Sequence, residues 1–128
     1  MLIAFYGFIP AGFPSPASDY EEDDLDINQH IIKHPSATFF FRADGESMIG
    51  AHIPPGAILV VDRSLRPKNG AIIVASVDGE FTVKRLERKV NRVRLLPENP
   101  KCRPIEITEG MSFEIWGVVR AIVIDKPE

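Results

Sequence analysis

Cysteine is almost absent from this chain, whose 128 residues include only Cys102. A single cysteine excludes an intramolecular disulfide, and a cysteine-based metal site would need partners at ligand spacing that the sequence does not supply. We therefore expect a protein that folds in a reducing cytoplasm without disulfides, a metal ion or another cofactor.

Long hydrophobic runs are also missing. Apolar stretches such as residues 57–61 are far shorter than the roughly 20 residues needed to cross a membrane. The apolar start of the chain lacks a basic segment and reaches Pro10 before a signal sequence of useful length could form. Neither secretion nor membrane insertion is predicted, so the expected location is the cytoplasm.

The chain has no excess of positive charge, since its formal net charge is -3. Nonspecific affinity for nucleic acids depends on clustered Lys and Arg, so direct DNA binding is not expected. The basic residues that gather between Lys84 and Arg94 are typical of the solvent face of an antiparallel hairpin. Hydrophobic residues make up 45% of the chain, which is enough for one compact core.

Residues 10–26 are predicted to form an extended arm. Its helix-breaking residues are Pro10, Gly12, Pro14 and Pro16. They are followed by a mostly acidic stretch, residues 19–26, which has too few apolar side chains to build a core. Prolines push the preceding residues toward extended conformations, and proteases bind extended segments.

From Thr38 onward the apolar stretches are short, rich in Val, Ile and Phe, and separated by turn signals, which predicts an all-β domain. The expected strands are 38–43, 57–62, 71–77, 80–86, 92–96, 104–107 and 113–124. Asp78-Gly79 predicts a type I′ hairpin turn. Upstream, Asp26 followed by Gln29 predicts a short capped helix of about two turns. The expected organisation is an arm over residues 1–34 and a barrel-like β domain over residues 35–128.

Ser47 lies in the segment Gly45-Glu46-Ser47-Met48, directly after an expected strand. Gly45 permits a sharp turn, which would expose the Ser47 hydroxyl and direct nearby backbone N–H groups inward. Taken alone, a serine beside a glycine is far more often an ordinary turn residue. The segment is therefore a candidate nucleophile site that needs a base.

Lys84 is the candidate base, because side-chain alternation in residues 80–86 places Thr82, Lys84 and Leu86 on one face. A lysine base must be neutral, and deprotonating it at pH 7 costs roughly 4.6 kcal/mol in water. Burial can supply this energy by lowering the pKa. Thr82 would hydrogen-bond the amine and direct its lone pair toward Ser47. In the alternative interpretation Lys84 reaches solvent.

Other residue sets are weaker candidates. Ser47 with His52 and an acid such as Asp62 would be a catalytic triad, but proximity in sequence does not establish triad geometry. His30 and His34 have the spacing of two metal ligands on a helix, yet no third ligand is evident nearby. Trp116 and residues 118–124 are expected to fill the core or a dimer interface rather than a cofactor pocket.

Three segments, in this order, resemble the LexA/UmuD family of self-cleaving Ser/Lys peptidases. The matching segments are Ala11-Gly12-Phe13-Pro14-Ser15-Pro16-Ala17 for the cleavage segment, Gly45-Glu46-Ser47-Met48 for the nucleophile turn and Phe81-Thr82-Val83-Lys84-Arg85-Leu86 for the base-bearing strand. Further matches, including His34-Pro35-Ser36-Ala37-Thr38 and Leu95-Leu96-Pro97-Glu98-Asn99-Pro100, extend the similarity from residue 11 to the end of the chain.

The resemblance implies a compact all-β, barrel-like peptidase fold and a reaction. Ser47 would cleave the Ala11–Gly12 bond of the arm, with Lys84 as general base and the backbone N–H groups of Ser47 and Glu46 as oxyanion donors. It also implies a homodimer, stimulation of cleavage by a RecA filament on single-stranded DNA, and a UmuC-like polymerase as partner in translesion synthesis.

Two alternatives to this function remain at the level of sequence. One is a prophage or plasmid regulator with the same peptidase chemistry and another client, and the other is a noncatalytic binding module that retains the fold. A LexA-type repressor is not expected, because its helix-turn-helix domain precedes the cleavage segment and only eleven residues precede Gly12 here.

Overall fold

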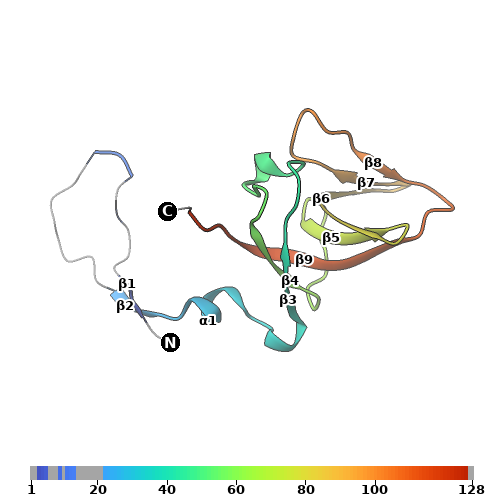
Figure 1. Ribbon diagram of the computed structural model, residues 1–128. Coiled ribbons are helices and arrows are strands. Elements are labelled where there is room, and N and C mark those ends of the chain that lie inside the picture. The colour runs from blue at the N-terminus through green and yellow to red at the C-terminus, as the bar shows by residue number, and fades with distance from the viewer. Residues whose placement is uncertain (1–2, 6–8, 10, 14–21, 127–128) are drawn as a thin grey trace. The chain divides into compact units, whose positions relative to one another are not determined.

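The computed structural model describes residues 3–5, 9, 11–13 and 22–126 (Figure 1). Much of the expected arm, namely Pro10 and residues 14–21 with Pro14 and Pro16, lies outside these described residues. The chain divides into two compact units, Met1–Lys33 and His34–Glu128. No helix in the described part of the chain is long and apolar enough to span a membrane.

The first unit contains two short antiparallel strands, β1 (Ile3–Phe5) and β2 (Glu22–Leu25), followed by helix α1 (Ile27–Ile31). Asp26 caps the helix, because its Oδ1 accepts hydrogen bonds from the backbone N–H groups of Asn28 at 3.0 Å and Gln29 at 3.5 Å. The capped helix is confirmed, although its length is five residues rather than two turns. The sequence pattern does not predict β2, since Asp and Glu are uncommon in strands.

The second unit contains a seven-stranded antiparallel sheet in the order β3-β4-β9-β5-β6-β7-β8. Its strands are β3 (Thr38–Arg42), β4 (Ile58–Asp62), β5 (Ile72–Val77), β6 (Glu80–Lys89), β7 (Arg92–Leu96), β8 (Ile105–Ile107) and β9 (Phe113–Val123). Two 3₁₀ turns, η1 (Pro35–Ala37) and η2 (Ile49–Ala51), flank β3. The all-β class is confirmed, and the main difference from expectation is that β6 continues to Lys89 because its charged end pairs with β7.

The hairpin between β5 and β6 turns at Asp78 and Gly79, whose φ angles of 49° and 84° are those of the expected type I′ turn. β9 is the longest strand and runs across the domain (Figure 1). It pairs with β5 through residues 113–118 and with β4 through residues 118–123, with a register shift in each ladder. These pairings bring the β3–β4 hairpin and the β5–β6 hairpin into one sheet.

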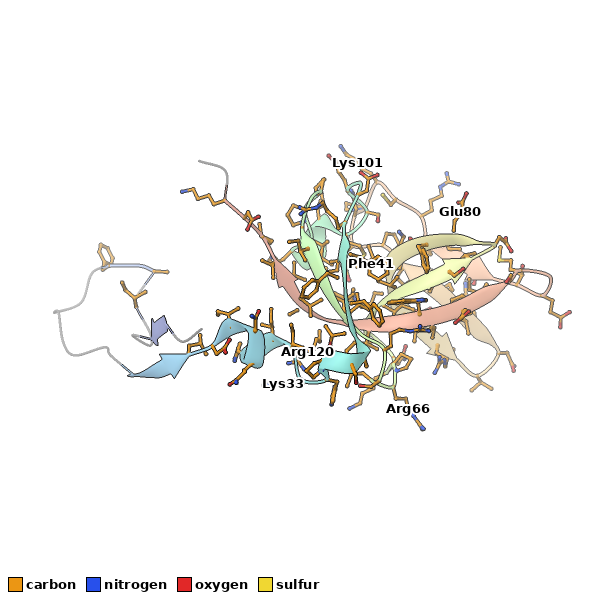
Figure 2. The ribbon with its side chains drawn as sticks, turned by 60° about the horizontal axis from the view of Figure 1, so that its bottom comes forward. Lys33, Phe41, Arg66, Glu80, Lys101 and Arg120 are labelled. Atoms are coloured by element: carbon orange, nitrogen blue, oxygen red, sulfur yellow. The ribbon has the colours of Figure 1, made fainter. Side chains whose placement is uncertain are left out.

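Side chains from the two sides of the sheet fill two hydrophobic clusters, because alternate residues of a strand face opposite ways. On β5, Val74 packs with Met48 and Leu59 in one cluster. Its neighbours Ile73 and Ala75 pack in the other, with residues of β6 and β7. In Figure 2 Phe41 lies among the strands, whereas Glu80 points outward from the start of β6. The first cluster contains Met48, the neighbour of the candidate nucleophile Ser47.

Asp62, at the end of β4, is a fully buried carboxylate. Its Oδ1 accepts hydrogen bonds from the N–H of Ser64 at 2.8 Å and the hydroxyl of Ser64 at 2.6 Å, and its Oδ2 lies 2.6 Å from Nδ1 of His34. Burial raises the pKa of the Asp62 carboxyl, but the hydrogen bonds from Ser64 and His34 outweigh it and bring the pKa from 3.8 to about 2. The ionised carboxylate is therefore a stabilising element.

This pKa shift makes the stability of the fold depend on pH in the acid range. Because the folded-state pKa lies below 3.8, the stabilisation is complete above that pH and is lost as the pH falls through about 2. The shift corresponds to about 2 kcal/mol. Asp62→Asn is expected to lower the free energy of unfolding at pH 7 by about that amount, and to flatten its pH dependence in this acid range. Denaturant unfolding measures both effects, and an Asn variant as stable as wild type at pH 7 would contradict the assignment.

Candidate active site

Ser47 lies at the tip of the turn that follows β3. Gly45 enters this turn with a φ of 79°, a conformation that favours glycine. Met48 is 2% exposed and packs in the first hydrophobic cluster, which anchors the turn. The side chain of Ser47 is half-buried. Packing Met48 inward therefore leaves the Ser47 hydroxyl at the surface of the core.

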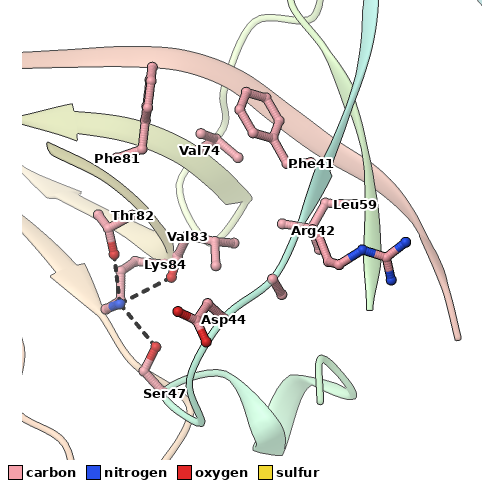
Figure 3. Close-up of a pocket in the computed structure, with 11 residues that line it drawn as sticks. Phe41, Arg42, Asp44, Ser47, Leu59, Val74, Phe81, Thr82, Val83 and Lys84 are labelled. Atoms are coloured by element: carbon pink, nitrogen blue, oxygen red, sulfur yellow. Dashed lines mark hydrogen bonds between the residues drawn. The ribbon is translucent and has the colours of Figure 1, made fainter. Parts of the chain in front are cut away.

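Lys84 lies on β6 beside this turn. Its Nζ is 3.0 Å from Oγ of Ser47, 2.8 Å from Oγ1 of Thr82 and 3.2 Å from the carbonyl oxygen of Val83 (Figure 3). Thr82 and Lys84 thus share one face of β6, as the alternation predicts. The structure brings together the three side chains singled out from sequence, although Ser47 is 37 residues from Lys84.

A pocket of about 190 Å³ surrounds this group (Figure 3). Aliphatic side chains from three strands, Leu59, Val74 and Val83, form part of its lining. Phe41 and Phe81 also line it, and their ring centroids lie 5.9 Å apart. This lining leaves the Lys84 amine half-buried, and partial burial penalises its charged form.

Burial lowers the pKa of the Lys84 amine from its ordinary value of 10.5, and the nearby Cys102 thiol group, when ionised, acts in the opposite direction. A neutral amine has two N–H bonds and one lone pair. With its N–H groups directed to Thr82 and Val83, the lone pair faces the Ser47 hydroxyl and is able to accept its proton. The alternative in which Lys84 reaches solvent does not fit these contacts.

The backbone N–H groups of Glu46 and Ser47 are the oxyanion donors implied by the family resemblance. Within the described part of the chain, neither group donates a hydrogen bond, so both remain available to a ligand. The carbonyl groups of the same two residues are engaged. The Asn99 side chain donates to the Glu46 oxygen at 2.9 Å, and the Glu98 N–H donates to the Ser47 oxygen at 2.7 Å.

The sequence alone predicts no role for Asn99 or Glu98, although both lie in a segment that resembles the family. The available signal was the turn-forming run Pro97-Glu98-Asn99-Pro100. A turn motif does not reveal its partner, and Asn99 is 53 residues from Glu46. Their contacts with the nucleophile turn are visible only in the structure.

The competing residue sets are not assembled. The Asp62 carboxylate bonds to Ser64 and His34, while His52 is exposed and ends η2 in a left-handed conformation. Among the described residues, no group of three or more His, Cys, Asp and Glu side chains is placed to hold a metal ion. Ala11 and Gly12 lie exposed in a bend of the first unit.

An all-β domain that presents a serine hydroxyl to a half-buried amine in an apolar pocket has the make-up of a serine peptidase. Residues 4–120 match the model of the peptidase S24-like family, and the chain belongs to this family. The expected LexA/UmuD relationship and fold are thereby confirmed.

Three relatives define the similarity more closely. SamA from Salmonella typhimurium is 48% identical over 114 residues, which cover 89% of this chain and 79% of SamA. MucA from Escherichia coli is 46% identical over 121 residues, which cover 93% of this chain and 82% of MucA. Both are UmuD-like proteins. LexA repressor 2 from Geobacter sulfurreducens is 36% identical over 118 residues, or 92% of this chain and 57% of the repressor.

Proposed function

We propose that this protein is a UmuD-like peptidase that cleaves its own arm, residues 1–34, between Ala11 and Gly12. Ser47 is the nucleophile and Lys84 the general base, both within the β domain of residues 35–128. The observation that carries the proposal is the 3.0 Å contact between Nζ of Lys84 and Oγ of Ser47, in a pocket that lowers the pKa of the amine.

The reaction uses the neutral amine twice. Lys84 takes the proton of the Ser47 hydroxyl while Oγ attacks the carbonyl carbon of Ala11, and the N–H groups of Ser47 and Glu46 stabilise the resulting oxyanion. Lys84 then gives this proton to the departing amine of Gly12, which leaves Ala11 as an ester on Ser47. Water attacks the ester with Lys84 again accepting a proton, and the returning proton restores the serine hydroxyl.

The proposal includes a setting in the response to DNA damage, supported by similarity to the UmuD-like proteins SamA and MucA. A RecA filament on single-stranded DNA stimulates cleavage, and the shortened homodimer joins a UmuC-like polymerase for error-prone translesion synthesis. One feature of the fold supports a homodimer. Beyond Val118, β9 pairs with β4 on one edge, and no strand of the described part covers its other edge.

Mass spectrometry of the purified protein incubated with an activated RecA filament tests the proposal, with Ser47→Ala as the control. The expected wild-type product is a fragment that begins at Gly12, and the control is expected to remain intact. A different new N-terminus contradicts the assigned bond, and cleavage of the Ser47→Ala protein contradicts the nucleophile. A wild-type chain that also stays intact during prolonged alkaline incubation supports the noncatalytic alternative.

A further inference from the structure

The connection between β7 and β8 lies against the turn that carries Ser47 (Figure 1). Three hydrogen bonds join the two segments. Asn99 Nδ2 donates to the Glu46 carbonyl at 2.9 Å, the Glu98 N–H donates to the Ser47 carbonyl at 2.7 Å, and the Gly50 N–H donates to the Glu98 carbonyl at 2.8 Å. The loop therefore contacts the nucleophile turn on both sides of Ser47.

The contact of Asn99 has a direct consequence for the proposed oxyanion site. The Glu46 carbonyl and the Ser47 N–H belong to one planar trans peptide, so they point in opposite directions. A donor that fixes the carbonyl oxygen also fixes the direction of the N–H, and hydrogen bonds at both ends of a peptide polarise one another. The Ile49 N–H donates to the same oxygen at 3.3 Å, so Asn99 makes the shorter contact.

Glu98 connects this loop to the strand that carries the base. Arg85 follows Lys84 on β6, and its Nε donates to Oε1 of Glu98 at 2.6 Å. Its Nη1 donates to the Gly70 carbonyl at 2.6 Å, which fixes the guanidinium between two loops. Both partners of the ion pair are about one-third exposed, so solvent weakens their attraction and the geometry matters more than the charge. Glu98 thus contacts both the β6 strand and the Ser47 turn.

We infer that Asn99 is a positioning residue for the peptidase reaction. Its side-chain amide orients and polarises the Ser47 N–H, which donates to the oxyanion, and Glu98 holds this loop against both the nucleophile turn and β6. The inference rests on the proposed function, because it concerns the oxyanion site of the same reaction.

Asn99→Asp separates this role from a local structural one. Oδ1 of Asn99 also accepts from the Lys101 N–H at 3.0 Å, and aspartate keeps this acceptor while losing the donor to Glu46. We expect the plateau rate of alkaline self-cleavage to fall by about 10- to 100-fold, as activity does when a hydrogen bond that orients a metal ligand is removed from a metalloenzyme. Asn99→Ala is expected to lower the plateau similarly without moving the pH midpoint, which belongs to Lys84.

Asn69→Ala is the matched control. Asn69 is also a loop asparagine whose side chain bonds to a strand backbone, with Oδ1 accepting from the Arg88 N–H at 2.9 Å, and it does not contact the nucleophile turn. This variant is expected to cleave at the wild-type plateau rate. Thermal unfolding of each variant verifies that the domain is folded under the assay conditions.

A second readout keeps the inference testable if the wild-type chain does not cleave itself, an outcome that contradicts the proposed function instead. The rate at which a fluorophosphonate labels Ser47 also depends on donors to the phosphoryl oxygen. Asn99→Asp is expected to be labelled more slowly than wild type. The inference is overturned if Asn99→Asp matches wild type in plateau rate and labelling rate, or if the loss in Asn99→Ala is entirely a shift of the pH midpoint.

Discussion

Lys84→Arg is expected to abolish self-cleavage at every accessible pH, although it preserves the positive charge and much of the size of the side chain. The arginine guanidinium stays protonated in proteins and is unable to accept the Ser47 proton. The wild-type rate, in contrast, is expected to rise with pH through the lowered pKa of Lys84 and then to level off. Only the neutral form of Lys84 is able to accept a proton. Its fraction falls about tenfold for each pH unit below that pKa, so the rate of self-cleavage falls by the same factor.

The measurement is the first-order rate of formation of the Gly12 fragment between about pH 6 and 10.5, a range that brackets the ordinary lysine pKa. Lys89→Arg is the matched control, because it makes the same exchange at the exposed end of the same strand. This control is expected to cleave as wild type does. Equal rates for Lys84→Arg and wild type, or a flat wild-type profile, would rule out lysine as the base.

The local pattern of the sequence was sufficient for the elements that carry the site. Alternating side chains define β6, and the same period of two places Thr82 and Lys84 on one face. Asp78 and Gly79 define the hairpin that leads into this strand, because both residues tolerate positive φ. These predictions depend only on residues close together in the chain, where steric preferences act directly.

Contacts between distant segments were beyond this pattern. Ser47 and Lys84 are brought together by the packing of the β3–β4 and β5–β6 hairpins around β9, which no local period encodes. The sequence does not predict the contact of Asn99, because its partner is a backbone carbonyl and every residue has one. The His34–Asp62 pair likewise joins η1 to the end of β4 across 28 residues. The family resemblance predicts the contact between Ser47 and Lys84. The contacts of Asn99 and of the His34–Asp62 pair follow only from the fold.

Gly50→Ala is expected to reduce the rate of self-cleavage by about 100-fold while leaving the domain folded, because a shift of about 1 Å in positioned groups has an effect of this size. Gly50 lies in η2, where an added Cβ would be 2.6 Å from the Glu98 carbonyl oxygen. That oxygen is a backbone atom, so the loop itself must move away. The movement breaks the bond from the Gly50 N–H and withdraws Glu98 and Asn99 from the nucleophile turn.

Ile49→Ala is the control for Gly50→Ala, since it changes the neighbouring residue of the same 3₁₀ turn. The Ile49 side chain is 46% exposed, and its truncation leaves the backbone bonds of the turn in place. Ile49→Ala is expected to cleave near the wild-type rate. Gly50 is itself exposed and outside both hydrophobic clusters, so its variant is expected to unfold near the wild-type temperature. If Gly50→Ala cleaves as fast as Ile49→Ala, the contact between the 97–100 loop and the Ser47 turn is not needed for the reaction.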